Sequence, residues 1–299
     1  MRYVIGIDAG GTKTVGLLAD ERGHVVREAR GGGANLVALG ELAVEKSLYQ
    51  VLDALDAPAP VDALCLGIAG ADRPEDQALL IALLRRLGFR RSVHVVHDAH
   101  VALVAGAPEG VGIVLVAGTG SIAYGVDPSG ATARSGGWGY LLGDEGSAFW
   151  LGHAAVRQGI RAADGRGPAT SLYERICRVL GIAEPSGLVQ WFYDQELSHY
   201  RVAQLAEVVQ AAADEGDEAA RALLDQAAQH LARAARAVAK RLEFDAPYAL
   251  VLSGGAFKAC PGLCPRVEAS LDLPLARVVR LEAEPATGAV TLALALLDE

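Results

Sequence analysis

The stretch VIGIDAGGTKTVGLLADERG, at residues 4–23, joins two short apolar runs through a Gly-Gly-Thr turn and ends in Asp-Glu-Arg-Gly. The runs are rich in β-branched and aliphatic residues, which is typical of strands. Asp opens a tight turn, and Gly supplies the positive φ that such a turn needs. The stretch therefore predicts strands at 2–8 and 14–20, followed by a third at 24–30.

The same order of features recurs at residues 112–130, GIVLVAGTGSIAYGVDPSG. A strand, a glycine-rich turn, a second strand and a D-x-x-G turn again follow one another. Repetition of such a unit indicates an internal duplication. We therefore expect an α/β protein with two like-folded domains that face each other.

The rest of the chain alternates strand and helix patterns at first and is mostly helical later. Further strands are expected at 63–70, 92–98, 112–118, 122–127, 131–135 and 248–255. Helices are expected at 37–55, 75–88, 99–106, 145–161, 168–181, 201–214, 217–243 and 285–298.

Composition and charge argue against several classes of partner. The chain has 299 residues, which is enough for two domains, and a net charge of −9. A surface of that sign repels nucleic acid and anionic membranes, so we expect neither as a partner. No apolar run approaches the roughly 20 residues that span a bilayer. The chain enters a strand pattern at once, so we expect no signal peptide and a cytoplasmic protein.

The four cysteines are Cys65, Cys177, Cys260 and Cys264. Only the last two are close in sequence, and their spacing matches neither a zinc ribbon nor a redox pair. We expect reduced, mostly buried thiols.

The Gly10-Gly11-Thr12 turn has the chemistry of a phosphate-binding loop. Glycine lets backbone N–H groups approach a phosphate closely, and threonine adds a hydroxyl donor. Asp8 suits such a place only if a cation lies between it and the phosphates, and Mg²⁺ is held in this way. Neither a Walker A loop nor a dinucleotide-binding fingerprint fits, because Lys13 comes one place late and a strand follows instead of a helix. The alternative is a plain hairpin turn.

Two further glycine turns follow predicted strands. Gly118-Thr119-Gly120-Ser121 has the matching position in the second repeat. Two such hairpins could hold one polyphosphate between the domains. Ser253-Gly254-Gly255-Ala256 follows a buried strand and would let a flat ring such as adenine approach the backbone.

Asp98 ends the predicted strand at 92–98, and open α/β sheets place ligands at the carboxyl ends of strands. Phosphoryl transfer needs a group that orients the acceptor hydroxyl and takes its proton, which is a role of aspartate in kinases. The alternative is that Asp98 caps the helix that follows. We expect the flanking residues His97 and His100 to be spacers without chemistry.

The order of these motifs resembles the sugar-kinase, Hsp70 and actin ATPase superfamily, and within it the N-acetylglucosamine kinases and the related BadF/BadG-type ATPases. The resemblance covers almost the whole chain. It runs through IDAGGTKT, the lone Asn in GGGANL, HDAH, GTGS, GGWGYLLGDEGSAFW and SGG. The long GGWG segment at 136–150 is its most specific part.

The resemblance implies two actin-like, ribonuclease-H-like domains on either side of a nucleotide cleft. We expect one to comprise residues 1–106 and 285–299, and the other residues 107–284 with a helical insertion. Asp8 would be the acid associated with Mg²⁺. The residues implied to bind ATP are Gly10, Gly11, Thr12, Lys13, Gly118, Thr119, Gly120, Ala213, Gly254 and Gly255.

For the sugar, the resemblance implies Asp98 as the catalytic base. The residues implied to contact the sugar are Asn35, Asp98, Ser121, Ile122, Gly137, Trp138, Gly139 and Asp144. Trp138 would form a flat wall beside the ring. Asp144 would bind hydroxyl groups or cap the helix that follows, and Phe149 and Trp150 are expected in the core. For Asn35, the alternative is a loop residue in left-handed geometry.

Together these features predict an ATP-dependent kinase that phosphorylates the 6-hydroxyl of a hexose or amino sugar, with N-acetylglucosamine favoured and a homodimer as its assembly. A glucosamine kinase or a broad-specificity hexokinase is the nearest alternative. An iron–sulfur ATPase that activates a dehydratase, and a sugar-sensing protein without turnover, are alternatives of other classes.

Overall fold

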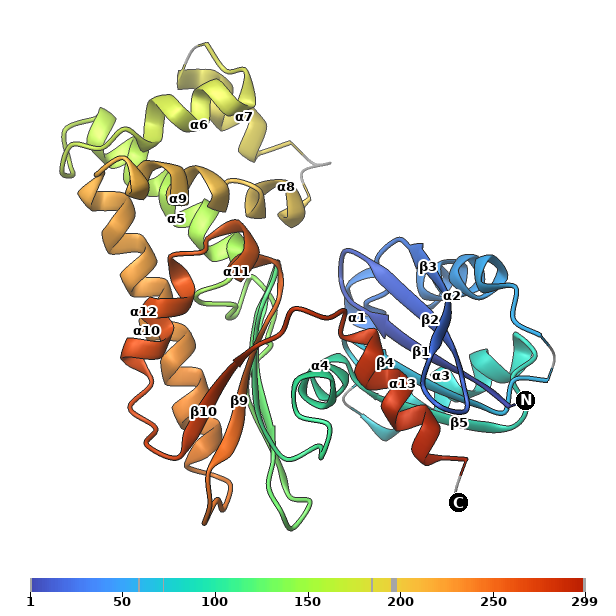
Figure 1. Cartoon of the computed structure of the whole chain (residues 1–299). Helices are drawn as coiled ribbons and strands as arrows, with labels where there is room; N and C mark the ends of the chain where they lie inside the picture. The colour runs from blue at the N-terminus through green and yellow to red at the C-terminus, as the bar shows by residue number, and fades with distance from the viewer. Residues whose placement is uncertain (1, 59, 72, 184, 195–197, 298–299) are drawn as a thin grey trace.

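The computed structural model describes residues 2–58, 60–71, 73–183, 185–194 and 198–297. The chain forms two lobes, each built on one five-stranded mixed sheet and flanked by helices (Figure 1). This arrangement confirms the predicted fold class.

The two sheets have the same topology. The first has the order β3-β2-β1-β4-β5 and the second the order β8-β7-β6-β9-β10. In each, the first strand pairs antiparallel with the second and parallel with the fourth. The internal duplication read from residues 4–23 and 112–130 is therefore confirmed. The strands are β1 (Tyr3–Ala9), β2 (Thr14–Asp20), β3 (Val25–Gly31), β4 (Ala63–Ile68), β5 (Ser92–His97), β6 (Gly112–Ala117), β7 (Ser121–Val126), β8 (Thr132–Gly136), β9 (Tyr248–Ser253) and β10 (Ala276–Arg280).

Helices cover the faces of both sheets. The first lobe carries α1 (Leu36–Leu39), α2 (Glu41–Leu55), α3 (Pro74–Arg86), α4 (Asp98–Gly106) and α13 (Ala286–Ala295). The second lobe carries α5 (Ala148–Ala163), α6 (Leu172–Leu180), α7 (Pro185–Phe192), α8 (His199–Ala203), α9 (Ala206–Asp214), α10 (Glu218–Ala239), α11 (Gly255–Ala259) and α12 (Leu263–Ser270). The helices α5 to α10 lie between β8 and β9 in the sequence and form the large helical part of this lobe (Figure 1).

Several boundaries differ from the sequence prediction. The helix predicted at 37–55 breaks into α1 and α2, because Gly40 has a φ of +78° that no α-helix contains. The helix predicted at 201–214 is divided into α8 and α9. We did not predict α7, α11, α12 or β10, which are short and depend on packing against neighbours. The last helix ends at Ala295, and residue 298 of the predicted span lies outside the described residues.

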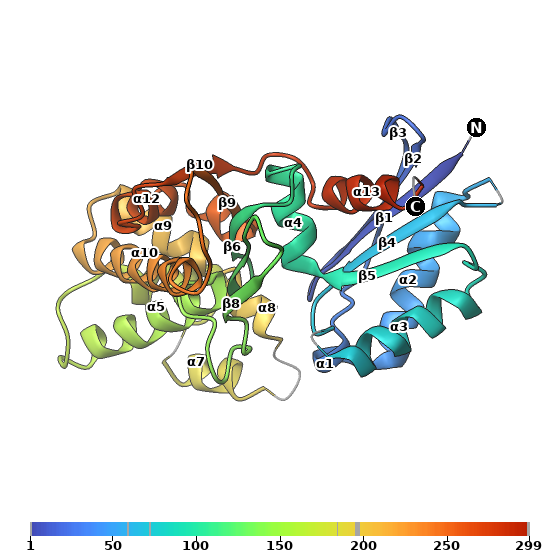
Figure 2. The same cartoon turned by 90° about the horizontal axis from the view of Figure 1, so that it is seen from below.

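Helix α4 lies between the two sheets (Figures 1 and 2). Its Val101 belongs to a buried cluster with residues of β1 and α13 in the first lobe. Its Ala102 and Leu103 belong to a cluster with Val114 of β6 and Val251 of β9 in the second lobe. One helix is therefore buried by the cores of both lobes.

Helix α13 returns from the second lobe to pack on the first, against β1 and α4. Glycines allow this close contact: a side chain at Gly6 would place its first carbon 2.3 Å from the backbone nitrogen of Val290. We accordingly propose the division that the sequence suggested, with residues 1–106 and 285–299 in one domain and 107–284 in the other.

Among the described residues, no helix is both long and apolar enough to cross a membrane.

Replacement of Gly288 by alanine should destabilise the protein, because the new carbon would lie 2.0 Å from the carbonyl oxygen of Val101 and 2.6 Å from the nitrogen of Ala105. Neither backbone atom can move without shifting α4. We expect the free energy of unfolding to fall by roughly 1–3 kcal/mol, as is usual for overpacked sites. Urea denaturation would measure the change. Gly32→Ala is the control, because nothing lies within 4 Å of its added carbon; equal losses in both variants would contradict this packing.

Candidate functional site

The loop between β1 and β2 is held by the glycine segment that follows β3. The backbone N–H of Gly10 donates to Lys13 (3.0 Å), and that of Ala34 donates to the carbonyl of Gly10 (2.9 Å). A side chain at Gly33 would come within 2.3 Å of the carbonyl oxygen of Gly11. The predicted phosphate loop and the segment leading to Asn35 therefore lie in direct contact.

Asn35 caps helix α1 and leaves one polar group for a ligand. Its Oδ1 accepts a hydrogen bond from the backbone N–H of Ala38 (2.9 Å). Its φ of −104° is extended, so the alternative of left-handed geometry is wrong. Among the described residues, no group accepts from its side-chain nitrogen, which is therefore available to donate to a hydroxyl group.

Lys13 and Arg30 both pair with Glu284, just before α13. The Lys13 Nζ lies 2.9 Å from Oε2 of Glu284, and Arg30 Nη2 lies 2.9 Å from Oε1. The segment that returns from the second lobe is thus tied to the predicted phosphate loop of the first. Glu284 belongs to no motif in the sequence, and its contact with Lys13 could not be predicted because the two residues lie far apart in the chain.

The loop between β6 and β7 lies next to the turn after β9. The backbone N–H of Gly118 donates to Gly120 (2.9 Å). Gly254 has a φ of +114°, and a side chain there would come within 2.3 Å of the carbonyl oxygen of Ala117. A side chain at Gly118 would reach the backbone nitrogen of Gly255 at 4.0 Å. The second predicted phosphate loop and the predicted adenosine turn are therefore neighbours.

The first turn of α5 meets the same loop. The N–H groups of Ala148 and Phe149 donate to the carbonyls of Gly118 (2.9 Å) and Thr119 (3.3 Å). These bonds satisfy donors that a helix start otherwise leaves unpaired. They fix the Gly-Thr loop to the helical part of the second lobe.

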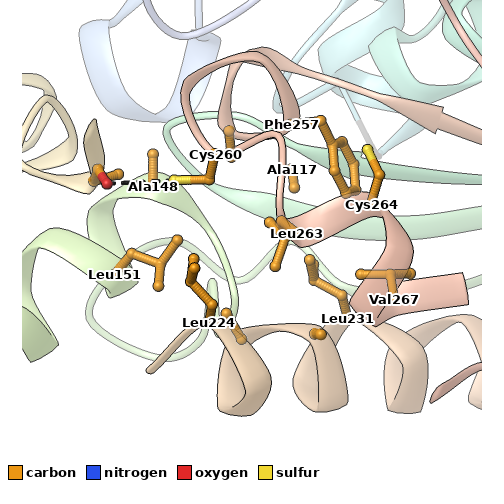
Figure 3. Packing of buried hydrophobic residues seen from close by; sticks show 14 of the residues in the cluster. Ala117, Ala148, Leu151, Leu224, Leu231, Phe257, Cys260, Leu263, Cys264 and Val267 are labelled. Atoms are coloured by element: carbon orange, nitrogen blue, oxygen red, sulfur yellow. Dashed lines mark hydrogen bonds between the residues drawn. The ribbon is translucent and has the colours of Figure 1, made fainter. Parts of the chain in front are cut away.

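Ala213 lies near the end of α9, and its side chain is 5% exposed within the core of the second lobe. The opposite end of α9 approaches the Gly254 turn, because the Cys260 thiol donates to the carbonyl of Ala206 at 3.3 Å (Figure 3). The assignment of Ala213 to the nucleotide stays a prediction.

Asp8 and Asp98 influence one another electrostatically. Burial and, to a lesser degree, the charges of Asp98 and Glu284 raise the pKa of Asp8 to about 7, against a lowering by Lys13. Like charges in one site disfavour ionisation unless a cation compensates them. Among the described residues no group of three or more His, Cys, Asp or Glu side chains could hold a metal by itself. Mg²⁺, which binds through one or two carboxylates, waters and phosphate oxygens, suits this arrangement.

Asp98 is the first residue of α4, and His97 is its N-cap. The backbone N–H of Ala99 lies within hydrogen-bonding distance of Asp98 Oδ1 (2.8 Å) and of His97 Nδ1 (3.0 Å). The interpretation of Asp98 as the N-cap is therefore wrong by one residue, although its carboxylate still accepts from the first turn. The side chain is 24% exposed, so a ligand can reach it.

His97 is not the spacer that we expected. Its Nδ1 lies 2.8 Å from Oδ1 of Asp98. The same Nδ1 accepts from the backbone N–H of Ala99 (3.0 Å), so the imidazole lies against both the Asp98 carboxylate and the start of α4. The ring also stacks on Tyr124 of the second lobe, with 5.9 Å between centroids and 3° between planes. His100 packs on the same tyrosine at 5.7 Å.

The stretch 136–143 is a loop with three left-handed glycines. Gly136, Gly137 and Gly139 have φ values of +79°, +74° and +81°. Trp138 between them is 62% exposed, and the guanidinium carbon of Arg134 lies 4.7 Å from the centre of its ring. Cations over the face of tryptophan are attracted by the ring quadrupole. The tryptophan is thus presented to solvent by a fixed backbone.

Phe149 and Trp150 are partly buried against the core of the second lobe, as predicted. Alanine and leucine residues of α5, α10, α11 and α12 make up much of that core (Figure 3).

Asp144 holds the Gly-Thr loop of the second lobe and does not cap α5. Its Oδ1 accepts from the backbone N–H of Ser121 (3.1 Å), and any side chain at Gly120 would come within 2.7 Å of its Oδ2. The N-cap of α5 is Ser147, whose hydroxyl accepts from Trp150 (3.1 Å). The capping alternative is therefore wrong. Burial raises the pKa of Asp144, against a lowering by the Ser121 hydrogen bond.

Two cavities flank β7. One, of about 350 Å³, lies between the lobes and is lined by residues that include His97, Tyr124 and Arg134. The other, of about 320 Å³, lies towards α10 and is lined by residues that include Ser121 and Ile122. The second cavity is therefore lined by two residues predicted to contact the sugar, and the first includes His97, the sequence neighbour of Asp98.

All four cysteines are free and buried, in agreement with the prediction. Burial raises the pKa of Cys260 to about 12, with smaller rises from Glu207 and Asp214. A thiol of this kind stays protonated and is a poor metal ligand.

Comparison with known proteins gives consistent matches over both lobes. A sequence profile of the BadF/BadG/BcrA/BcrD ATPase family matches residues 5–293. The N-acetylmuramic acid/N-acetylglucosamine kinase of Clostridium acetobutylicum is 32% identical over 306 residues, covering 100% of both chains. The N-acetyl-D-glucosamine kinase of Dictyostelium discoideum is 31% identical, with 97% of each chain covered. A crystal structure from Chromobacterium violaceum, described as an N-acetylglucosamine kinase, has a TM-score of 0.79 at 29% identity and covers 98% of this chain and 99% of its own.

Replacement of Asp8 by asparagine should stabilise the ligand-free protein at alkaline pH. A carboxyl with a folded pKa of about 7, against an ordinary value of 3.8, costs stability once it must ionise. That cost is absent below pH 3.8, grows as the pH rises and is complete above about 7. We expect the melting temperature of Asp8→Asn to exceed that of the wild type at pH 8 by a few degrees, and by less at pH 5.

Thermal scans at both pH values test this expectation, with Asp53→Asn on the exposed face of α2 as the matched control. A lower melting temperature for Asp8→Asn at pH 8 would mean that the fold stabilises the ionised carboxylate, contrary to this account.

Proposed function

The chain belongs to the BadF/BadG/BcrA/BcrD ATPase family, and from that membership we propose that it is an ATP-dependent kinase of the 6-hydroxyl of an amino sugar, with N-acetylglucosamine as the first candidate. The full-length similarity to two kinases that are named for this sugar supports the substrate. The observation that carries the proposal is that Asp8, next to the Gly10-Gly11-Thr12 loop, is buried and lies within reach of the charge of Asp98, which raises its pKa further.

In this proposal the backbone N–H groups of the two Gly-Thr loops bind the phosphates of ATP from both lobes. Gly255 leaves room for adenosine, since nothing lies within 4 Å of a side chain added there, and Gly254 lets the turn pass close to the backbone of Ala117. Asp8 would hold Mg²⁺, which, when bound, neutralises charge on the phosphates that are transferred. Lys13 remains close to the phosphates through its pairing with Glu284.

Asp98 would accept the proton of the 6-hydroxyl as this oxygen attacks the γ-phosphate. The backbone N–H of Ala99 lies 2.8 Å from Oδ1 of Asp98, which leaves Oδ2 for the hydroxyl. General-base assistance of this kind contributes roughly 10²–10⁴-fold to a rate. Trp138 would lie beside the sugar ring, and Asn35 would donate to a hydroxyl group. Asp144 would act on the sugar partly through the position of Ser121, whose N–H it binds.

Glucosamine and other hexoses stay alternative substrates, and N-acetylmuramic acid joins them because one relative is named for it. The iron–sulfur alternative is disfavoured, since Cys260 and Cys264 lie buried within one core and would have to face a partner to share a cluster. A sensor without turnover would not need Asp8 and Asp98 together. A cytoplasmic homodimer stays a prediction from the sequence.

The proposed activity can be tested directly by measuring ATP consumption with N-acetylglucosamine, glucosamine, glucose and N-acetylmuramic acid. The position of the phosphate on the product would be read by NMR. We expect turnover with N-acetylglucosamine and a 6-phosphate product. Hydrolysis of ATP that is independent of every sugar would contradict the proposal and favour an ATPase of another kind.

The Asp98→Asn variant should lose turnover and keep its substrate. The amide preserves shape but cannot accept the proton, so kcat should fall by roughly 10²–10⁴-fold while the sugar Kd changes little. Steady-state kinetics and calorimetric titration of the sugar would measure the two effects. Asp225→Asn, the same chemical change far from the site, should have the activity of the wild type. Turnover near that of the wild type in Asp98→Asn would contradict the assignment of Asp98 as the general base.

A further inference from the structure

The cavity of about 350 Å³ between the lobes has no part in the mechanism above. Its lining comprises Ala71, Gln77, Val96, His97, His100, Tyr124, Thr132, Ala133, Arg134 and Arg241. None of these described residues was assigned to the nucleotide or the sugar. The volume lies within the range of roughly 300–1,000 Å³ that is usual for ligand sites.

The cavity adjoins the proposed sugar site from both lobes. On the first lobe, His97 lines it and contacts the carboxylate of Asp98 at 2.8 Å. On the second lobe, Arg134 lines it and lies 4.7 Å from the ring centre of Trp138. A sugar placed between Asp98 and Trp138 would therefore have this cavity beside it. A substituent on the ring can enter the cavity while the 6-hydroxyl stays at Asp98.

The lining has the charge of an anion site. It contains two guanidinium groups, and none of the described residues in it is a carboxylate. Burial lowers the pKa of His100, and the nearby His94 and His97 lower it further. At neutral pH the positive charge therefore comes from the arginines, and the imidazole of His100 is a neutral hydrogen-bonding group.

Arg241 is the side chain best prepared for a ligand. Its Nη1 donates to the backbone carbonyl of Arg134 (3.1 Å), which fixes the guanidinium at the cavity. In the part of the chain that the structure describes, it has no ion pair, whereas Arg30 and Arg175 are paired with glutamates. A guanidinium has five N–H donors, so most of those of Arg241 remain for an acceptor.

We propose that this cavity is a subsite for an anionic substituent of the sugar, and that Arg241 binds the carboxylate of that substituent. The inference rests on the proposed kinase function and assigns a subsite to one of its alternative substrates, an acetamido sugar that carries a carboxyalkyl ether. A planar guanidinium matches a carboxylate through two parallel N–H···O bonds. Arg134 adds a second positive charge on the same wall.

N-acetylmuramic acid and N-acetylglucosamine are the probes, because they share the acetamido ring and differ by one carboxyethyl ether. We expect the Arg241→Gln variant to raise the Kd and lower kcat/KM for N-acetylmuramic acid by about tenfold. That is the lower end of the effect of a charge-assisted hydrogen bond, as befits an exposed arginine. Values for N-acetylglucosamine should change less than about twofold. Arg241→Lys keeps the positive charge, so it should lose less affinity for N-acetylmuramic acid than Arg241→Gln does.

Lys240→Gln is the matched control: it removes the same charge one residue away, at an exposed position outside the lining. Equal effects of Lys240→Gln and Arg241→Gln would overturn the subsite, as would equal losses for both sugars in Arg241→Gln. A third outcome would also overturn the proposal: free lactate inhibits the wild type but not Arg241→Gln, while N-acetylmuramic acid binds equally to both. The cavity would then bind a free anion and not a substituent of the sugar.

The proposal and the kinase function fail in different ways. Turnover of N-acetylglucosamine without binding of N-acetylmuramic acid would overturn the subsite alone. If neither sugar is phosphorylated, the kinase proposal fails, and calorimetric binding of N-acetylmuramic acid to wild type and Arg241→Gln still decides the subsite.

Discussion

The carboxyl groups of Asp8 and Asp98 lie at the same edge of one sheet, and the electrostatics of the site depend on this arrangement. Strands β1, β4 and β5 run parallel, so the end of β1 with Asp8 and the end of β5 with Asp98 lie on the same side. Burial raises the pKa of Asp8, and the charge of Asp98 raises it as well. The fold therefore keeps a carboxyl that is costly to ionise, and in the proposed function Mg²⁺ and the phosphates of ATP would relieve that cost. A protein that only needed stability would not keep these two acids together.

Much of the fold was predictable because it is encoded locally. Residues 4–23 and 112–130 carry alternating apolar runs and turn residues that specify hairpins without help from the rest of the chain. The common topology of the two sheets follows from that repetition. Short elements such as α7, α11 and β10 escaped prediction because their residues carry weak local signals and are ordered by the surfaces they cover. The break between α1 and α2 has a local cause in the sequence, because Gly40 favours the positive φ at which α1 ends.

The site was predictable where function needs a rare residue or a special backbone. The glycines of the 136–139 loop and Gly254 do adopt positive φ values, and Asp98 lies at a strand end. The stacking of His97 on Tyr124 and the contacts of Glu284 and Arg241 were not predictable, because each joins segments far apart in the chain. Asp144 is instructive, since its place before a helix suggested a cap, while its carboxylate turns back to the Gly-Thr loop.

The order in which the lobes are built follows from the position of α13. This helix packs on β1 and α4, yet it is made of the last described residues of the chain. During synthesis on the ribosome, the first lobe cannot finish folding until α13 is made, and the apolar face that α13 covers stays exposed to solvent. The second lobe, whose strands and helices form one continuous segment from β6 at Gly112 to β10 at Arg280, can close earlier. The first lobe is thus synthesised first but folds completely only after α13 has been made. Until then, the apolar face that α13 covers is the surface to which a chaperone would bind.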